Sequence, residues 1–251
     1  MRIQDWKLPP RVHALCTTRL GGVSLPPYDC LNLGDHVQDD PQHVAQNRNL
    51  LKQQLDGARP VFLKQVHGVD VLNLQPVTPD GAIADACMTQ EIDLACTIMV
   101  ADCLPILFTD SLGTTVAAAH AGWRGLAQGV IENTVQTLCG HSGAKSGELL
   151  VWLGPCIGPS AFEVGAEVRQ AFLQADETAK CCLKAHPKNP QKYLADLPAL
   201  ARKRLRSLGV QSIAGNDSSD AWCTVQQASR FFSYRRDGVT GRFAACIWRS
   251  S

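Results

Sequence analysis

The sequence has no long apolar run and no excess of charge of one sign. Its longest apolar stretch, Leu94 to Phe108, is interrupted by Asp102 and Pro105 and is too short to span a bilayer. The 24 Lys and Arg nearly balance the 23 Asp and Glu, and the resulting net charge of +1 does not favour a nucleic-acid or membrane surface. The first six residues also lack the apolar core of a secretory signal. We therefore expect a cytoplasmic protein that has neither nucleic acid nor a membrane as a partner.

Closely spaced cysteine pairs are also missing. The chain has 11 cysteines, but no two of them form a Cys-x-x-Cys pair of the kind that builds a structural zinc finger. An odd cysteine count without a secretory signal argues against a disulfide framework. We expect free thiols in a reducing compartment, and we assign no catalytic role to the adjacent pair Cys181-Cys182.

Strand-like and helix-like patterns alternate along the chain, and no linker is long enough to separate domains. We therefore expect one catalytic domain over residues 1–251. Because the strands are clustered as well as alternating, we predict an α+β fold with a mixed β-sheet and flanking helices. The predicted strands cover residues 12–17, 61–67, 69–74, 94–101, 105–109, 114–120, 149–153, 210–214 and 243–248. The predicted helices cover residues 41–55, 126–139, 163–175 and 193–208, with a mobile loop at 179–191.

Three short segments each place a strong metal ligand at or near the end of an apolar run. They are Gln65-Val66-His67-Gly68, Ala101-Asp102-Cys103-Leu104-Pro105 and His120-Ala121-Gly122-Trp123-Arg124-Gly125. Taken singly, each ligand has an ordinary structural explanation, since buried cysteines are common and usually inert. Taken together, His67, Cys103 and His120 leave a fourth coordination position open, as a catalytic zinc requires. We assign Asp102 to orienting a histidine or capping a turn, and not to general-base catalysis.

The same segments suggest an anion site. The glycines around Trp123 precede a predicted helix, whose first turn favours negative charge. Arg124 can offer a bidentate contact to phosphate, and Arg19 and Arg235 are the other two candidates. An ion pair on a loop is the competing explanation for each arginine. Further candidates are Trp123 and Tyr234, whose rings could stack on a purine or pack in the core, and Cys223, which could line the pocket.

These motifs resemble the YfiH-like family, also called the laccase-domain family, whose members are identified as purine nucleoside phosphorylases. The likeness begins at Thr17-Thr18-Arg19-Leu20-Gly21-Gly22-Val23-Ser24 and continues through Leu31-Asn32-Leu33-Gly34 and the three segments above. It then includes Leu153-Gly154-Pro155-Cys156-Ile157-Gly158-Pro159 and ends with Arg230-Phe231-Phe232-Ser233-Tyr234-Arg235-Arg236-Asp237-Gly238. It implies a layered mixed-sheet fold with one catalytic zinc bound by His67, Cys103 and His120. It further implies phosphorolysis of adenosine, inosine and 5′-methylthioadenosine to base and ribose 1-phosphate, with adenosine deamination beside it.

Two other functions stay open. The first is a copper-dependent polyphenol oxidase, which the old family label suggests but which needs several coppers, whereas this chain has only seven histidines. The second is a hydrolase that edits peptidoglycan precursors, with Cys103 as nucleophile and His120 as base. The sequence does not rank the nucleosides, and it leaves the oligomeric state and the native metal, zinc or copper, undetermined.

Overall fold

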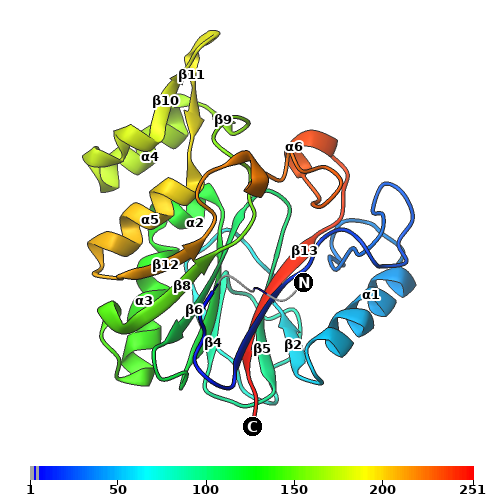
Figure 1. Cartoon of the computed structure of the whole chain (residues 1–251). Coiled ribbons are helices and arrows are strands. Elements are labelled where there is room, and N and C mark those ends of the chain that lie inside the picture. Colours follow the sequence, from blue (N-terminus) through cyan, green and yellow to red (C-terminus); the bar gives the residue numbers. More distant parts are fainter. Residues whose placement is uncertain (1–2, 4–5) are drawn as a thin grey trace.

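A computed structural model of the protein describes Ile3 and residues 6–251. The expectation about the N-terminus depends partly on residues 1, 2, 4 and 5, which lie outside this part of the chain. Two mixed β-sheets stack on each other, and helices cover the outer face of each sheet (Figure 1). The predicted α+β fold with mixed-sheet pairing and flanking helices is confirmed, with two such sheets in place of one.

The larger sheet has six strands in the order β12-β8-β6-β7-β4-β3. Its inner pairs are antiparallel, and its two edge pairs are parallel. The strands are β3 (Val71–Asn73), β4 (Ala86–Thr89), β6 (Leu104–Asp110), β7 (Val116–Ala121), β8 (Leu149–Leu153) and β12 (Ser212–Gly215). The sequence patterns missed β4, whereas the strand predicted over 114–120 corresponds to β7 and includes His120.

The smaller sheet has four strands in the order β1-β13-β5-β2, and only its β2–β5 pair is parallel. The strands are β1 (Val12–Cys16), β2 (Arg59–Phe62), β5 (Leu94–Val100) and β13 (Phe243–Arg249). The prediction of a strand as far as His67 was wrong, because β2 ends at Phe62. Beyond it, the Gln65 side chain bonds both the N–H and the C=O of Met99, so the side chain occupies the backbone groups that a longer β2 would pair with.

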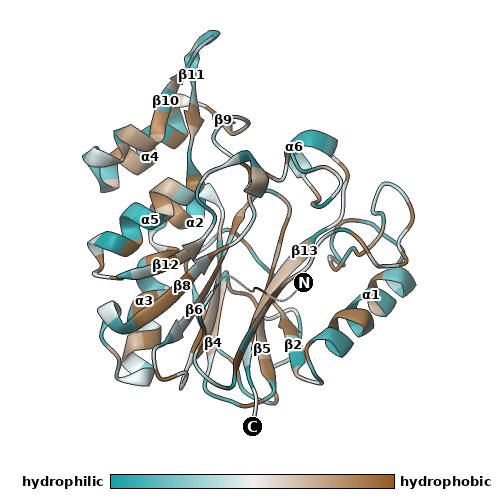
Figure 2. Ribbon diagram, viewed as in Figure 1, coloured by the Kyte–Doolittle hydropathy of each residue, from teal (hydrophilic) through white to brown (hydrophobic). Residues whose placement is uncertain are grey.

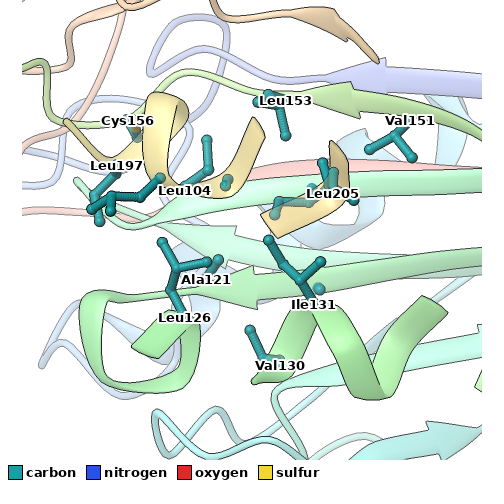
Figure 3. Packing of buried hydrophobic residues seen from close by; sticks show 14 of the residues in the cluster. Leu104, Ala121, Leu126, Val130, Ile131, Val151, Leu153, Cys156, Leu197 and Leu205 are labelled. Atoms are coloured by element: carbon teal, nitrogen blue, oxygen red, sulfur yellow. The ribbon is translucent and has the colours of Figure 1, made fainter. Parts of the chain in front are cut away.

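Successive side chains of each strand point to opposite faces of the sheet, and this produces three apolar layers. In β13, Phe243, Ala245 and Ile247 face the core between the sheets, whereas Ala244, Cys246 and Trp248 face α1. The opposite face of the larger sheet packs against the other long helices, with Leu104 and Ala121 near Leu126 and Ile131 (Figure 3). Figure 2 shows the brown apolar colour concentrated on the strands and on the inner sides of the helices. Both sheets are therefore fixed by burial on their two faces, which gives their strand ends defined positions.

The longer helices begin and end where local chemistry allows. They are α1 (Pro41–Gln54), α3 (Val130–Ser142), α4 (Ala166–Ala175) and α5 (Leu197–Ser207), and the short ones are α2 (Trp123–Gln128) and α6 (Tyr234–Asp237). The single helix predicted over 126–139 is in fact α2 and α3. It is interrupted at Gly129, whose φ of 105° is a left-handed conformation that glycine adopts without strain.

A third small sheet replaces the mobile loop predicted over 179–191. Its order is β10-β11-β9, with β9 (Glu163–Val164), β10 (Leu183–His186) and β11 (Asn189–Ala195), and its hairpin projects at the top of Figure 1. The helices predicted to begin at Glu163 and Tyr193 begin later because Glu163 and Tyr193 belong to this sheet. The Asp196 side chain caps α5 by accepting the Ala199 N–H.

None of the helices in the described part of the chain combines the length and the hydropathy that a bilayer crossing requires. Each of the 11 cysteines is a free thiol.

Candidate metal centre

The structure brings His67, Cys103 and His120 together although they are far apart in the sequence. Their ligand atoms all lie within 4.8 Å of one another. His67 Nε2 is 3.8 Å from Cys103 Sγ, and the two imidazole rings meet edge to face with their centroids 4.8 Å apart. His120 is buried, Cys103 is half-buried and His67 is exposed. The cluster could hold a metal ion, and it is open to solvent on the side of His67.

Asp85, directly before β4, orients His120. The imidazole Nδ1 donates to Asp85 Oδ1 at 2.8 Å, and the His120 backbone N–H donates to the Asp85 carbonyl at 2.7 Å. Asp85 is fully buried, and His120 is only 4% exposed. Because Nδ1 is used by the carboxylate, Nε2 is the nitrogen left for a ligand, an arrangement typical of metal-binding histidines.

The same carboxylate fixes the loop that carries His67. Asp85 Oδ1 accepts the His67 N–H at 2.9 Å, and Oδ2 accepts the N–H groups of Val66 and Gly68 at 3.0 and 2.7 Å. These bonds stabilise His67 in a left-handed backbone conformation with φ of 62°. Burial by itself raises the pKa of Asp85, but the bonds from His120 and the loop amides lower it below its usual value. A single buried anion therefore positions both histidines.

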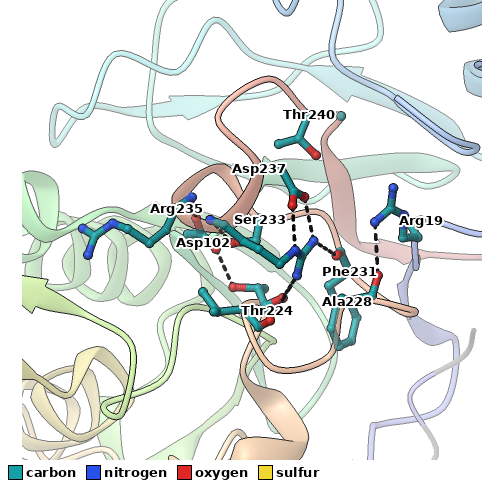
Figure 4. Close-up of polar contacts among 12 residues, drawn as sticks. Arg19, Asp102, Thr224, Ala228, Phe231, Ser233, Arg235, Asp237 and Thr240 are labelled. Atoms are coloured by element: carbon teal, nitrogen blue, oxygen red, sulfur yellow. Dashed lines mark hydrogen bonds and ion pairs between the residues drawn. The ribbon is translucent and has the colours of Figure 1, made fainter. Parts of the chain in front are cut away.

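Sequence reasoning missed Asp85 and gave the histidine-orienting role to Asp102. The available signal was one acidic residue within the apolar run of residues 82–88. Asp102 forms no hydrogen bond to either histidine within the described residues. Its two carboxylate oxygens accept the Thr224 hydroxyl at 2.5 Å and the Arg235 backbone N–H at 2.6 Å (Figure 4). Asp102 thus ties α6 and the Thr224 segment to the β5–β6 turn that carries Cys103.

The charges of the cluster favour a thiolate. Burial raises the pKa of Cys103, but His120 and His67 outweigh burial and lower that pKa to about 6. Burial lowers the pKa of His120, but Cys103 and Asp85 raise it to about 9. The deprotonated sulfur is the form that binds a metal ion or acts as a nucleophile.

Gly122 lies directly against the cluster. A Cβ at this position would lie 2.7 Å from His67 Cδ2 and 3.2 Å from Cys103 Sγ. Only a residue without a side chain therefore lets α2 approach the three ligands this closely.

Arg19 and Arg124 differ in the contacts that their guanidinium groups already make within the protein. Arg19 forms an ion pair with Asp29 at 3.2 Å and donates to the Ala228 carbonyl at 3.1 Å, and it lies apart from Asp102 in Figure 4. Arg124 is exposed, and its guanidinium lies over the Trp123 ring, 4.6 Å from the centroid. Of the two, Arg124 is the more available to a ligand.

Arg235 lies next to the Cys103 turn through its backbone bond to Asp102. Its exposed side chain donates to the Glu163 carbonyl at 3.0 Å and lies over the Phe162 ring. Tyr234 beside it is 62% exposed and free to contact a planar ligand. Cys223 is fully buried and its sulfur accepts the Gly158 N–H, so its visible role is to hold a backbone turn.

Known proteins resemble this chain over almost its whole length. Residues 13–250 match the family described as multi-copper polyphenol oxidoreductase laccase. A Pseudomonas aeruginosa protein named purine nucleoside phosphorylase is 51% identical over 244 residues, covering 97% of this chain and 96% of that relative. The Escherichia coli purine nucleoside phosphorylase YfiH is 48% identical over 247 residues, covering 98% and 97%. A solved Neisseria meningitidis structure of the DUF152 family is similar with a TM-score of 0.92 at 43% identity, covering 100% of this chain and 99% of that one.

Proposed function

Because the chain belongs to the YfiH-like laccase family, we propose that it is a zinc-dependent purine nucleoside phosphorylase. The observation that supports this best is the open His67, Cys103 and His120 cluster, in a chain whose relatives are named purine nucleoside phosphorylase. We propose adenosine, inosine and 5′-methylthioadenosine as substrates, and adenosine deamination as a second activity of the same site.

The three side chains fit one zinc ion. Two imidazoles and one thiolate are a zinc donor set, and three protein ligands leave a position for a reactant. Asp85 holds His120 and the His67 loop in the orientation that binding needs. When bound, the ion supplies a Lewis acid that polarises a substrate oxygen. Copper binds the same donor types, so metal analysis has to distinguish the two.

In phosphorolysis, a phosphate oxygen forms a bond to C1′ of the ribose while the C1′–N9 bond breaks. The purine leaves with the bonding electrons and takes up a proton. The site must therefore hold an anion beside the sugar and a ring system next to it. Arg124 and Arg235 are exposed cations suited to the anion, whereas Arg19 would first have to exchange its ion pair with Asp29. Tyr234 and Trp123 offer ring faces to the purine.

Both sheets supply the proposed site, which supports treating residues 1–251 as one catalytic unit. Cys103 lies in the turn between β5 of the smaller sheet and β6 of the larger sheet. His67 follows β2, and Asp85 precedes β4. A separate folding unit built on either sheet alone would lack part of the cluster.

A second candidate is a cysteine hydrolase acting on peptidoglycan precursors. The observation that favours it is the sequence of contacts from Cys103 to His120 to Asp85, which resembles a nucleophile, base and orienting acid. Under this reading, activity survives zinc removal and iodoacetamide alkylates Cys103 rapidly in metal-free protein. Under the zinc reading, chelation abolishes activity and the metal shields Cys103.

A polyphenol oxidase is the third possibility, and the family description names it. Within the described residues, His67, Cys103 and His120 are the one cluster with metal-ligand geometry, and a multicopper site needs more. Protein purified without chelator is to be tested for bound metal and for turnover of an o-diphenol beside adenosine.

The deciding experiment is a product assay by mass spectrometry with adenosine and ¹⁸O-labelled phosphate, in zinc-loaded and in chelated protein. Ribose 1-phosphate supports phosphorolysis, and inosine supports deamination. Absence of both products in zinc-loaded protein would overturn the proposal. His43→Ala, which changes a histidine of α1, is the control for loss of a histidine outside the cluster.

A further inference from the structure

Arg242 lies at the sheet end that carries the Cys103 turn, although no sequence motif for binding includes it. It directly precedes β13, whose first residue Phe243 pairs with Val100, the last residue of β5. The antiparallel register therefore brings Arg242, which precedes β13, towards Ala101, which follows β5. Cys103 follows two residues further on.

The Leu31-Asn32-Leu33-Gly34 motif holds Arg242 in place. Asn32 is fully buried, and its Oδ1 accepts the Arg242 backbone N–H at 2.9 Å. The Asn32 amide in turn donates to Asp39 Oδ2 at 2.8 Å. A Cβ on Gly34 would lie 2.8 Å from Arg242 Cγ, so the absence of a side chain there makes room for the arginine stem. The motif thus fixes the position of this side chain.

The Arg242 guanidinium has no carboxylate partner among the ion pairs of residues 6–251. Its Nη1 donates to the carbonyls of Thr240 and Gly241, both at 3.0 Å, while its Nε and Nη2 bond no acceptor in the described part of the chain. Burial lowers the pKa of Arg242, and the nearby charges of Cys103 and Asp102 oppose that effect. Asp102 forms no ion pair with Arg242 within the described residues, and its two oxygens accept the Thr224 hydroxyl and the Arg235 backbone N–H.

We propose that Arg242 binds the anionic co-substrate, a phosphate oxygen, beside the His67, Cys103 and His120 cluster. This inference rests on the proposed function and adds a residue to it. A half-buried guanidinium that is held by its backbone and lacks an anion is organised in advance to receive one. Arg124 and Arg235 are more exposed, so solvent screens their charge more strongly.

The test compares Arg242→Met, Arg242→Lys and Gly34→Ala with Arg249→Met in zinc-loaded full-length protein. Arg249 lies at the other end of β13 and donates to the Gly113 carbonyl, so it is the matched control. Arg242→Met should raise the KM for phosphate about tenfold or more, as expected for loss of a charge-assisted contact. The KM for nucleoside and the zinc content should change less than about twofold. Arg242→Lys should recover part of the loss, and Gly34→Ala should act in the same direction because it displaces the arginine without removing its charge.

Binding of inorganic phosphate, measured by ³¹P NMR, separates failure of this inference from failure of the proposed function. If the wild type makes no ribose 1-phosphate, the proposed function fails, but loss of phosphate binding in Arg242→Met alone still supports the anion site. The inference is overturned if the wild type binds no phosphate or if Arg242→Met binds it as well as the wild type. Equal effects on both substrates, or loss of zinc, would indicate a structural role and also overturn it.

Discussion

Replacing Asp85 by asparagine is expected to loosen both histidines of the cluster at once. The carboxylate accepts four hydrogen bonds, two on each oxygen: His120 and His67 bond Oδ1, and Val66 and Gly68 bond Oδ2. Asparagine keeps only one acceptor oxygen. Whichever way the amide turns, two of the four donors lose their acceptor and face an N–H₂ group instead.

The expected loss of stability follows from the number of hydrogen bonds that the substitution removes. A hydrogen bond to a charged group stabilises a protein by about 1.5–3 kcal/mol, so losing two costs about 3–6 kcal/mol in the free energy of unfolding. Removing the partner of a metal-binding histidine typically weakens metal binding by about 10- to 100-fold. Because Asp85 is fully buried, water cannot replace the missing acceptor without opening the loop.

Two measurements check this expectation on the same protein. Urea unfolding of chelated protein gives the loss of stability, and competition with a chromophoric chelator gives the zinc affinity. Asp80→Asn is the control, because exposed Asp80 lies in the same connection between β3 and β4 and accepts one backbone N–H, from Phe62. Zinc affinity within about twofold of the wild type in Asp85→Asn would refute the reasoning, since the expected loss is tenfold or more.

Three further predictions concern the cluster and its surroundings. His67→Ala, Cys103→Ala and His120→Ala should each abolish adenosine turnover while circular dichroism stays native, and near-normal activity in one would remove that residue from the ligand set. Gly122→Ala should lower zinc affinity, since its Cβ would lie 2.7 Å from His67 Cδ2, and unchanged affinity by chelator competition would contradict this contact. Arg124→Ala should raise the KM for phosphate more than the KM for nucleoside, and an equal rise in both steady-state constants would argue against a phosphate role.

The sequence allowed most strands of the two sheets to be predicted, because buried strands give strong apolar patterns. The elements it missed depend on partners elsewhere in the chain. β4 is short, and β11 was taken for a helix because the pairing of Tyr193 with Val164 is not visible in a local pattern. The break at Gly129 was missed because a single glycine within a helical pattern is often tolerated.

The three candidate ligands could be selected from the sequence because histidine and cysteine have distinctive chemistry and each stands at a strand end or turn. Their meeting within 4.8 Å is a property of the tertiary structure, since two stacked sheets bring β2, β5 and β7 to one end. Asp85 and Arg242 show most clearly what could not be predicted from the sequence alone. An isolated aspartate or arginine has no fixed role in the sequence, and only burial and neighbouring donors or acceptors give it one. The sequence thus determined which atoms can bind a metal, and the fold decided which charges orient them, because electrostatic and hydrogen-bond contacts act across space and not along the chain.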